Sequence, residues 1–289
     1  MNNLQKMFRS LRNTRKVILP NAYGSYNNSR RLISRSYCEF RESSQAKESN
    51  NKNAAPGSSY AEADEKKYEQ DIKERILETA VKFAVDSGFT ISTLTAAGQA
   101  CGYPGVIHGL FPEGGADIVH YFNVKCNEQL VEHMKEWQKE NPPVEGATSP
   151  PVDFIQKCIM TRILMLDPYK RHWARALGLQ AMPNNVPKSL ATLLSLVDDI
   201  CYYAGDRSVD FNWYIRRVGL AGIYKASELF FLTDSSQDYT ATNHFVHSRI
   251  KDAELIQSAL SANPVAAAPQ ALSAAFTTAK NMLGMNALK

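Results

Sequence analysis

Hydrophobic residues recur every three to four positions along most of the chain, which is the spacing of one face of an α-helix. The first such stripe ends at Gly88 and consists of Ile72, Ile76, Leu77, Ala80, Val81, Phe83 and Ala84. Further helices are predicted over 92–101, 115–139, 154–166, 169–181, 188–204, 210–232 and 238–261. No segment alternates apolar and polar residues over the length of a strand, so the pattern predicts an all-α fold.

Proline and glycine clusters divide this helical pattern. The segment NPPVEGATSPP (141–151) predicts a linker between a first helical block, 66–140, and a second, 152–262. After Pro264, an amphipathic helix is predicted over 265–285. Two interpretations of that helix stay open: it lies on a membrane surface, or it packs on the bundle or on a second copy of the chain.

The positive charge of the chain is confined to one end. The 289 residues include 33 Lys+Arg and 29 Asp+Glu, a formal net charge of +4. Residues 1–38 hold eight of the basic residues and no carboxylate, so the remaining 251 residues have a net charge of −4. An acid-free start rich in arginine and serine is typical of a mitochondrial transit peptide. We therefore predict a transit peptide over 1–40 and a polar linker over 41–65, the alternative being a basic tail that binds nucleic acid.

The run RILETAVKFAVDSGFTISTLTAAGQACGYPGVIHGLFPEGGADIVHYF (75–122) resembles the DNA-binding domain of TetR-type repressors. The resemblance rests on an amphipathic helix that ends at Gly88, a helix of small residues, a glycine turn and a following long helix. It implies a TetR-like helical bundle with an N-terminal helix-turn-helix-like subdomain. No Lys or Arg occurs between Lys82 and Lys125, however, and DNA affinity depends chiefly on such residues. The sequence therefore predicts no nucleic-acid partner.

The sequence lacks the usual catalytic and metal-binding motifs. Ferritin-like di-iron sites use Glu-x-x-His pairs on bundle helices, and the nearest match, Asp117 with His120, stands alone. The five cysteines form no Cys-x-x-Cys motif, and His244 with His247 is interpreted as a surface pair. No nucleophile–base motif and no phosphate-binding loop occurs. We therefore predict that the protein is not an enzyme and holds no cofactor and no metal.

Aromatic residues gather at one predicted helix–loop–helix corner. Tyr202 and Tyr203 end one helix, Gly205 follows, and Trp213 and Tyr214 fall in the first turn of the next helix. Aromatic residues are favoured at the centre of protein interfaces, but tryptophan and tyrosine are also often largely buried in a core. The residues alone leave both interpretations open.

The run that contains this corner, LLSLVDDICYYAGDRSVDFNWYIRRVGLAGIY (193–224), resembles a family of mitochondrial accessory proteins required for ubiquinone (coenzyme Q) biosynthesis. The segments HWARAL (172–177), ELFFLTDSS (228–236) and LSAAFTTAKNMLGMN (272–286) fit the same family. The resemblance implies a TetR-like protein without catalysis that binds isoprenoid lipids and phospholipids. It also implies a place at the matrix face of the inner membrane, where the protein presents a quinone intermediate to the di-iron demethoxyubiquinone hydroxylase.

With this resemblance, the corner residues are assigned to a surface that binds the hydroxylase: Ile200, Tyr203, Asp210, Trp213 and Tyr214. TetR-type folds usually dimerise, which leaves a homodimer open. The second interpretation of the chain is a degenerate TetR-type regulator that senses a lipid-like ligand. The transit peptide and the missing basic surface favour the first interpretation over the second.

Arg217 lies one helical turn after Trp213, on the same face of the predicted helix. A guanidinium on a largely buried helix needs an anionic partner. That partner is either a carboxylate, with Asp198, Asp199 and Glu228 as candidates, or a lipid phosphate, which a guanidinium binds bidentately. The lipid binding that the resemblance implies makes Arg217 the candidate for the headgroup contact.

Overall fold

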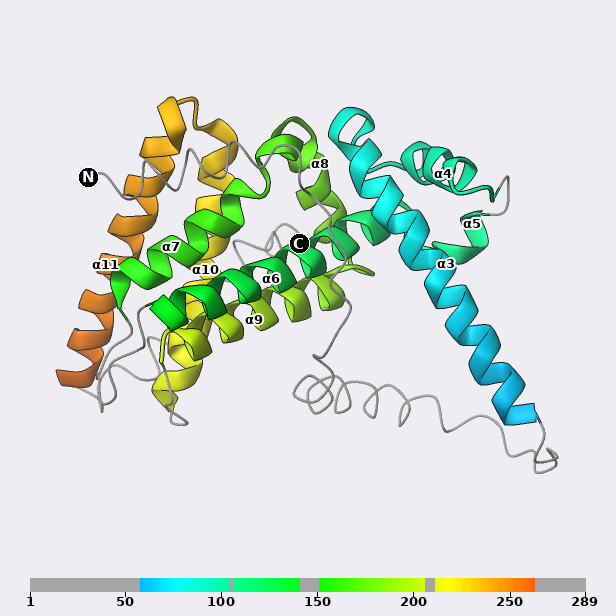
Figure 1. Ribbon diagram of the computed structural model, residues 1–289. Helices are drawn as coiled ribbons and strands as arrows, with labels where there is room; N and C mark the ends of the chain where they lie inside the picture. The colour runs from blue at the N-terminus through cyan, green and yellow to red at the C-terminus, as the bar shows by residue number, and fades with distance from the viewer. Residues whose placement is uncertain (1–57, 104–106, 141–150, 206–210, 263–289) are drawn as a thin grey trace, which may run out of the picture. The chain divides into compact units, whose positions relative to one another are not determined.

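Figure 1 shows a computed structural model of the protein. The structure describes residues 58–103, 107–140, 151–205 and 211–262. These residues form α3 (Ser58–Ser87), α4 (Ile91–Ala100), α5 (Ile107–Leu110), α6 (Gly115–Glu140), α7 (Val152–Leu164), α8 (Lys170–Gln180), α9 (Val186–Tyr203), α10 (Phe211–Thr233) and α11 (Thr240–Ala262). Two short 3-10 helices, η2 (Asp167–Tyr169) and η3 (Gln237–Tyr239), precede α8 and α11.

The predicted all-α fold is confirmed for this part of the chain, in which no strand occurs. The apolar stripe predicted over 115–139 is α6, and the stripe predicted over 188–204 is α9. The predicted segments 1–40 and 265–285 lie outside the described residues.

The start of α3 corrects one predicted boundary. The helix begins at Ser58, so the last eight residues of the predicted linker 41–65 are helical. These residues include Ala61, Glu62 and Glu65, which have high intrinsic helix propensity. They carry no apolar stripe, and hydrophobic periodicity therefore could not reveal them.

The helices from Tyr68 onward share one hydrophobic core, although the sequence predicts two blocks. α6 packs against α7, α8 and α9, and α10 packs against α7, α9 and α11. In Figure 1, α6 runs along α9 across the middle of this unit. The reason is the long apolar stripe of α6, from Ile118 to Met134, which is buried by helices of the second block.

Aromatic rings join the helix-turn-helix-like segment to α8. Phe89 lies 5.5 Å from Trp173, and Phe122 lies 4.6 Å from Tyr169, measured between ring centroids. Gly88 places Phe89 there with a positive φ of 72°, which favours glycine. Phe83, predicted as part of the α3 stripe, is exposed instead. It is displaced by about 100° around the helix from the buried residue Ala84.

Thr90 caps the N-terminus of α4, and its removal gives a test of this turn. The hydroxyl of Thr90 accepts a hydrogen bond from the backbone N–H of Thr93 at 3.1 Å. Thr90→Ala is expected to lower the free energy of unfolding by about 1 kcal/mol, because one helix-terminal N–H loses its acceptor. Urea unfolding measures the change. Thr95→Ala, in the middle of the same helix, is the control and should leave stability nearly unchanged; equal losses in both variants would contradict the capping role.

Candidate functional site

The predicted partner surface falls where α9 ends and α10 begins. Tyr202 is 51% exposed at the end of α9, with its ring 5.2 Å from the ring of Tyr203 at an interplanar angle of 87°. Gln138 of α6 donates a hydrogen bond to the backbone carbonyl of Tyr203 at 2.8 Å. The end of α9 is therefore held to α6, and Tyr202 is presented outward.

Two of the residues predicted for this surface are buried. Ile200 has 0% exposed area and Tyr203 is also buried, so neither side chain presents a contact surface in this structure. The reason is the packing of α9 on three sides, against α6, α7 and α10. Ile200 and Tyr203 therefore support the corner from inside in this structure, and their contact with a partner stays a prediction.

The structure covers the remaining predicted residues only in part. Trp213 and Tyr214 lie in the first turn of α10, whose backbone is described. Their side chains and the whole of Asp210 lie outside the described part of the chain. Their predicted contact with a partner is therefore untested.

Arg217 forms an ion pair with Asp198. Its Nε lies 2.8 Å from Asp198 Oδ1, the arginine is buried, and the aspartate side chain is 43% exposed. Of the carboxylates named as candidate partners, the structure thus pairs Arg217 with Asp198, one turn before Tyr202. This ion pair ties α9 to α10 just below the corner.

A second arginine, Arg162 of α7, is more deeply buried than Arg217, with 1% of its surface exposed. Its Nη2 donates to Asn123 Oδ1 at 2.6 Å and its Nε donates to Asn127 Oδ1 at 3.1 Å. Its Nη1 is buried without a hydrogen-bond partner. Arginine remains protonated even in a core, so a full positive charge lies inside the bundle.

Burial lowers the pKa of Arg162, whereas Tyr224, Cys126 and then Glu228 of α10 raise it. Glu228 is 1% exposed, accepts a hydrogen bond from Trp173 Nε1 at 2.9 Å, and lies 2.8 Å from Lys225 Nζ. The ion pair of this buried carboxylate is therefore with Lys225, whose side chain is 26% exposed. In the sequence, this cluster is marked by one arginine inside the apolar run 158–166. The predictions from the sequence did not include it.

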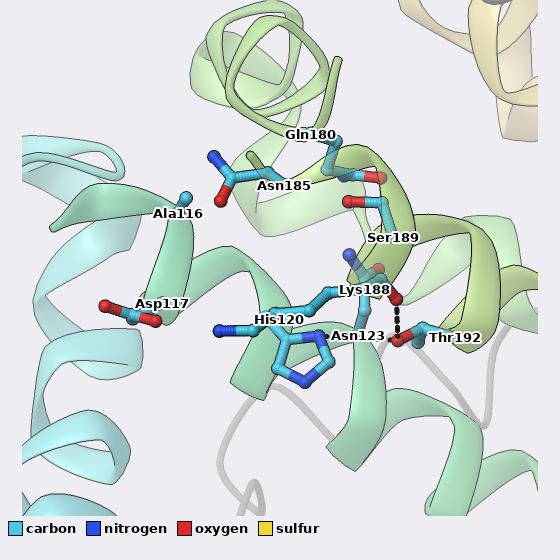
Figure 2. A pocket seen from close by; sticks show the side chains of 9 residues that line it. All are labelled: Ala116, Asp117, His120, Asn123, Gln180, Asn185, Lys188, Ser189 and Thr192. Carbon is cyan, nitrogen blue, oxygen red and sulfur yellow. Dashed lines mark hydrogen bonds between the residues drawn. The ribbon is translucent and has the colours of Figure 1, made fainter. Parts of the chain in front are cut away.

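A small polar pocket lies between α6 and the start of α9, beside the end of α8 (Figure 2). Its enclosed volume is about 10 Å³, the space of one water molecule. Its lining is Ala116, Asp117, His120 and Asn123 of α6, Gln180 of α8, Asn185 before α9, and Lys188, Ser189 and Thr192 of α9. Asn123 also accepts the hydrogen bond from Arg162, so the pocket borders the buried charge cluster.

The titratable groups of the pocket have shifted pKa values. Burial raises the pKa of Asp117, against a backbone hydrogen bond from Glu113 and the charge of Lys188. Burial and the charge of Lys188 lower the pKa of His120, whose Nδ1 lies 3.3 Å from the hydroxyl of Thr192. Lys188 thus lies close to both Asp117 and His120 in this narrow pocket. These two residues are the nearest match to a di-iron motif in the sequence.

Neither a metal cluster nor a membrane span is found in the part of the chain that the structure describes. No three His, Cys, Asp or Glu side chains come together there to hold a metal ion. None of the described helices is long and apolar enough to cross a bilayer.

Comparison with known proteins gives one consistent result. The COQ9 family model matches residues 186–257, which span α9, α10 and most of α11. The Ubiquinone biosynthesis protein COQ9, mitochondrial, of Drosophila melanogaster is 43% identical over 216 residues, which cover 74% of this chain and 65% of the fly protein. The protein of the same name from Rattus norvegicus is 37% identical over 220 residues, which cover 75% of this chain and 70% of the rat protein. The Homo sapiens protein is 36% identical over 220 residues, which cover 75% of this chain and 69% of the human protein. The alignment with the fly protein thus spans just under two thirds of that protein's length.

Proposed function

The chain belongs to the COQ9 family, whose curated members are named mitochondrial ubiquinone biosynthesis proteins, and we propose that it is a non-catalytic, lipid-binding adaptor of that pathway. In this proposal it binds isoprenoid quinone intermediates and phospholipid at the matrix side of the inner membrane. It then presents the quinone to the di-iron demethoxyubiquinone hydroxylase. The observation that carries the proposal is the similarity to COQ9 proteins over 216 to 220 residues.

The distribution of charge supports an adaptor over a TetR-type regulator. The helix-turn-helix-like segment has no Lys or Arg over 83–124, so it offers no cations to the phosphates of DNA. A transit peptide over 1–40 would direct the protein to mitochondria. The degenerate regulator remains the second interpretation, and only the helix-turn-helix-like segment 75–122 favours it.

The proposed partner surface is the outer side of the α9–α10 corner. Trp213, Tyr214 and Asp210 supply the contacts, and the exposed Tyr202 extends the surface along α9. Ile200 and Tyr203 hold this corner in shape from beneath. Aromatic side chains that become buried when two proteins bind often supply most of the binding energy of the interface.

Lipid binding in this proposal is driven by desolvation of the isoprenoid tail, at about 25 cal/mol per Å² of apolar surface removed from water. Leu190 and Leu194 of α9 and Met182 before it are exposed apolar side chains that support such a contact. The amphipathic segment 265–285 would add a membrane-surface anchor, or else the interface of a homodimer.

Arg217 is proposed to contact the lipid headgroup while it holds the corner through Asp198. Arg217→Gln is expected to lower the phospholipid that co-purifies with the protein about tenfold, because one charge-assisted hydrogen bond to phosphate is lost. Mass spectrometry of the lipid extract measures phospholipid and quinone together in wild type and variant.

Arg249→Gln is the matched control for this test. Arg249 forms an ion pair with Asp252 at 2.8 Å on the exposed side of α11, so its loss removes one surface ion pair without touching the corner. If the amount of phospholipid that co-purifies with Arg217→Gln equals that of the wild type, Arg217 only forms the ion pair with Asp198 and does not contact the headgroup. Wild-type protein that carries neither isoprenoid quinone nor phospholipid would contradict the adaptor itself.

A further inference from the structure

We propose that the pocket between α6 and the start of α9 binds a phosphate group, held by Gln180 and Lys188. The pocket lies away from the α9–α10 corner: Ser189 precedes Asp198 by nine residues, or roughly 14 Å along the helix axis. The proposal does not rest on the adaptor function, since it concerns a different group of side chains and a different ligand chemistry.

The amide of Gln180 is the first argument. Its Oε1 accepts a hydrogen bond from Lys225 Nζ at 3.3 Å. Because an ammonium group can only donate, the NH₂ group of Gln180 must occupy the other position of the amide. That Nε2 atom is buried and has no hydrogen-bond partner. A buried donor without a partner costs about 1–3 kcal/mol, and a ligand oxygen in the pocket would satisfy it.

Lys188 is the second argument. It lies in the first turn of α9, and its side chain extends across the pocket toward Asp117 and His120 (Figure 2). It forms no ion pair with any carboxylate in the described part of the chain, although its charge acts on both Asp117 and His120. An ammonium group at the pocket without a paired carboxylate favours an anionic ligand.

The start of α9 adds to the same preference. This helix has 18 residues, and Asn185 at its N-cap position makes no side-chain capping bond. The Asn185 amide donates instead to the carbonyl of Leu179 at 2.9 Å. The N–H of Val186 already donates to the carbonyl of Met182 at 3.0 Å and Pro187 has no N–H, so the start of α9 contributes its partial positive charge and not a set of free N–H donors. This charge and the hydroxyl of Ser189 in the pocket lining favour the oxygens of a phosphate.

Asp117 sets a limit on the charge of the ligand. One of its oxygens accepts the backbone N–H of Glu113 at 3.1 Å, and burial raises its pKa. A carboxylate beside an anion repels it unless the two share a proton. A phosphate group can supply that proton as a P–OH donor, which makes Asp117 an acceptor for the ligand. The enclosed space accommodates about one oxygen atom, so the rest of the ligand extends into solvent.

The phosphate can come from a soluble compound or from a lipid headgroup, and the test separates these sources. The full chain, labelled with ¹⁵N, is titrated with inorganic phosphate while the side-chain amide signals are recorded. The Gln180 signal is the one that disappears in Gln180→Met. We expect this signal to shift saturably in the wild type, and the dissociation constant to rise at least tenfold in Lys188→Gln.

Lys251→Gln is the matched control, because Lys251 is an exposed lysine of α11 and its loss changes the net charge equally. All variants keep the same basic N-terminal segment, so nonspecific phosphate binding by that segment cancels. Asp117→Asn keeps an oxygen that can accept the P–OH hydrogen bond and removes the negative charge that repels the ligand, so it should tighten binding several-fold. The proposal is overturned if the Gln180 signal does not shift, or if Lys188→Gln binds phosphate as the wild type does.

Flotation with phosphatidylcholine vesicles, with and without phosphatidic acid, identifies the source. If Lys188→Gln loses the part of vesicle binding that depends on phosphatidic acid, a lipid headgroup supplies the phosphate. If it loses inorganic phosphate but keeps vesicle binding, the ligand is a soluble phosphate compound. Both results support the phosphate site, and neither depends on whether the protein carries a quinone.

Discussion

Replacing Glu228 by glutamine is expected to lower the free energy of unfolding by about 2–3 kcal/mol, because the ammonium group of Lys225 loses its carboxylate partner. Glu228 is 1% exposed and lies 2.8 Å from Lys225 Nζ. The glutamine can still accept the hydrogen bond from Trp173, but its NH₂ group cannot pair with Lys225. For a chain of this size the loss corresponds to a fall in melting temperature of about 4 °C or more, which thermal unfolding followed by circular dichroism would measure.

A second substitution separates charge from shape in this cluster. Lys225→Met in the Glu228→Gln background removes the cation that lost its carboxylate, so it should restore part of the lost stability. Glu136→Gln is the surface control: that side chain is 69% exposed in its pair with His133, and the change should stay below about 0.5 kcal/mol. If Glu228→Gln were as mild as Glu136→Gln, the ion pair between Glu228 and Lys225 would not stabilise the bundle.

Trp213→Ala is expected to weaken binding of the di-iron hydroxylase about 30-fold or more, the effect of losing an interface hot spot of about 2 kcal/mol. Trp213 lies in the first turn of α10, beside the end of α9 where Tyr202 is exposed. Helical content and melting temperature should stay close to those of the wild type. Biolayer interferometry with immobilised hydroxylase measures the affinity.

Tyr68→Ala is the control for this substitution, because Tyr68 is an exposed aromatic residue of α3 and lies outside the corner. It should bind the hydroxylase as the wild type does. A result in which Trp213→Ala loses stability along with binding would assign Trp213 to the core instead of the partner surface.

Hydrophobic periodicity predicted the long helices well, and it failed where burial depends on a neighbouring helix. The stripe of α6 was identified to within one residue at its C-terminus, because 26 residues of repeating pattern leave little ambiguity. Phe83 was misplaced because a single residue at the edge of a stripe can face either the core or solvent. The first turns of α3 were missed because charged, helix-forming residues carry no apolar signal.

The sequence also predicted only part of the candidate site. The sequence located the α9–α10 corner and named Asp198 among three candidate partners of Arg217, and the structure forms that pair. It could not show that Ile200 and Tyr203 face inward, since that depends on how α9 is enclosed by α6, α7 and α10.

By itself, the sequence determined the all-α fold class, the basic segment at the N-terminus, the lack of cations over 83–124 and the membership of the COQ9 family. These are properties of local patterns and of similarity along the chain. Only the tertiary structure decided that Arg162 bonds to Asn127 and Trp173 to Glu228, and that Asp117 and Lys188 border one pocket. The side chains of each of these pairs lie at least 35 positions apart in the sequence and meet because helices pack, and no pattern within one helix records which helix will lie beside it.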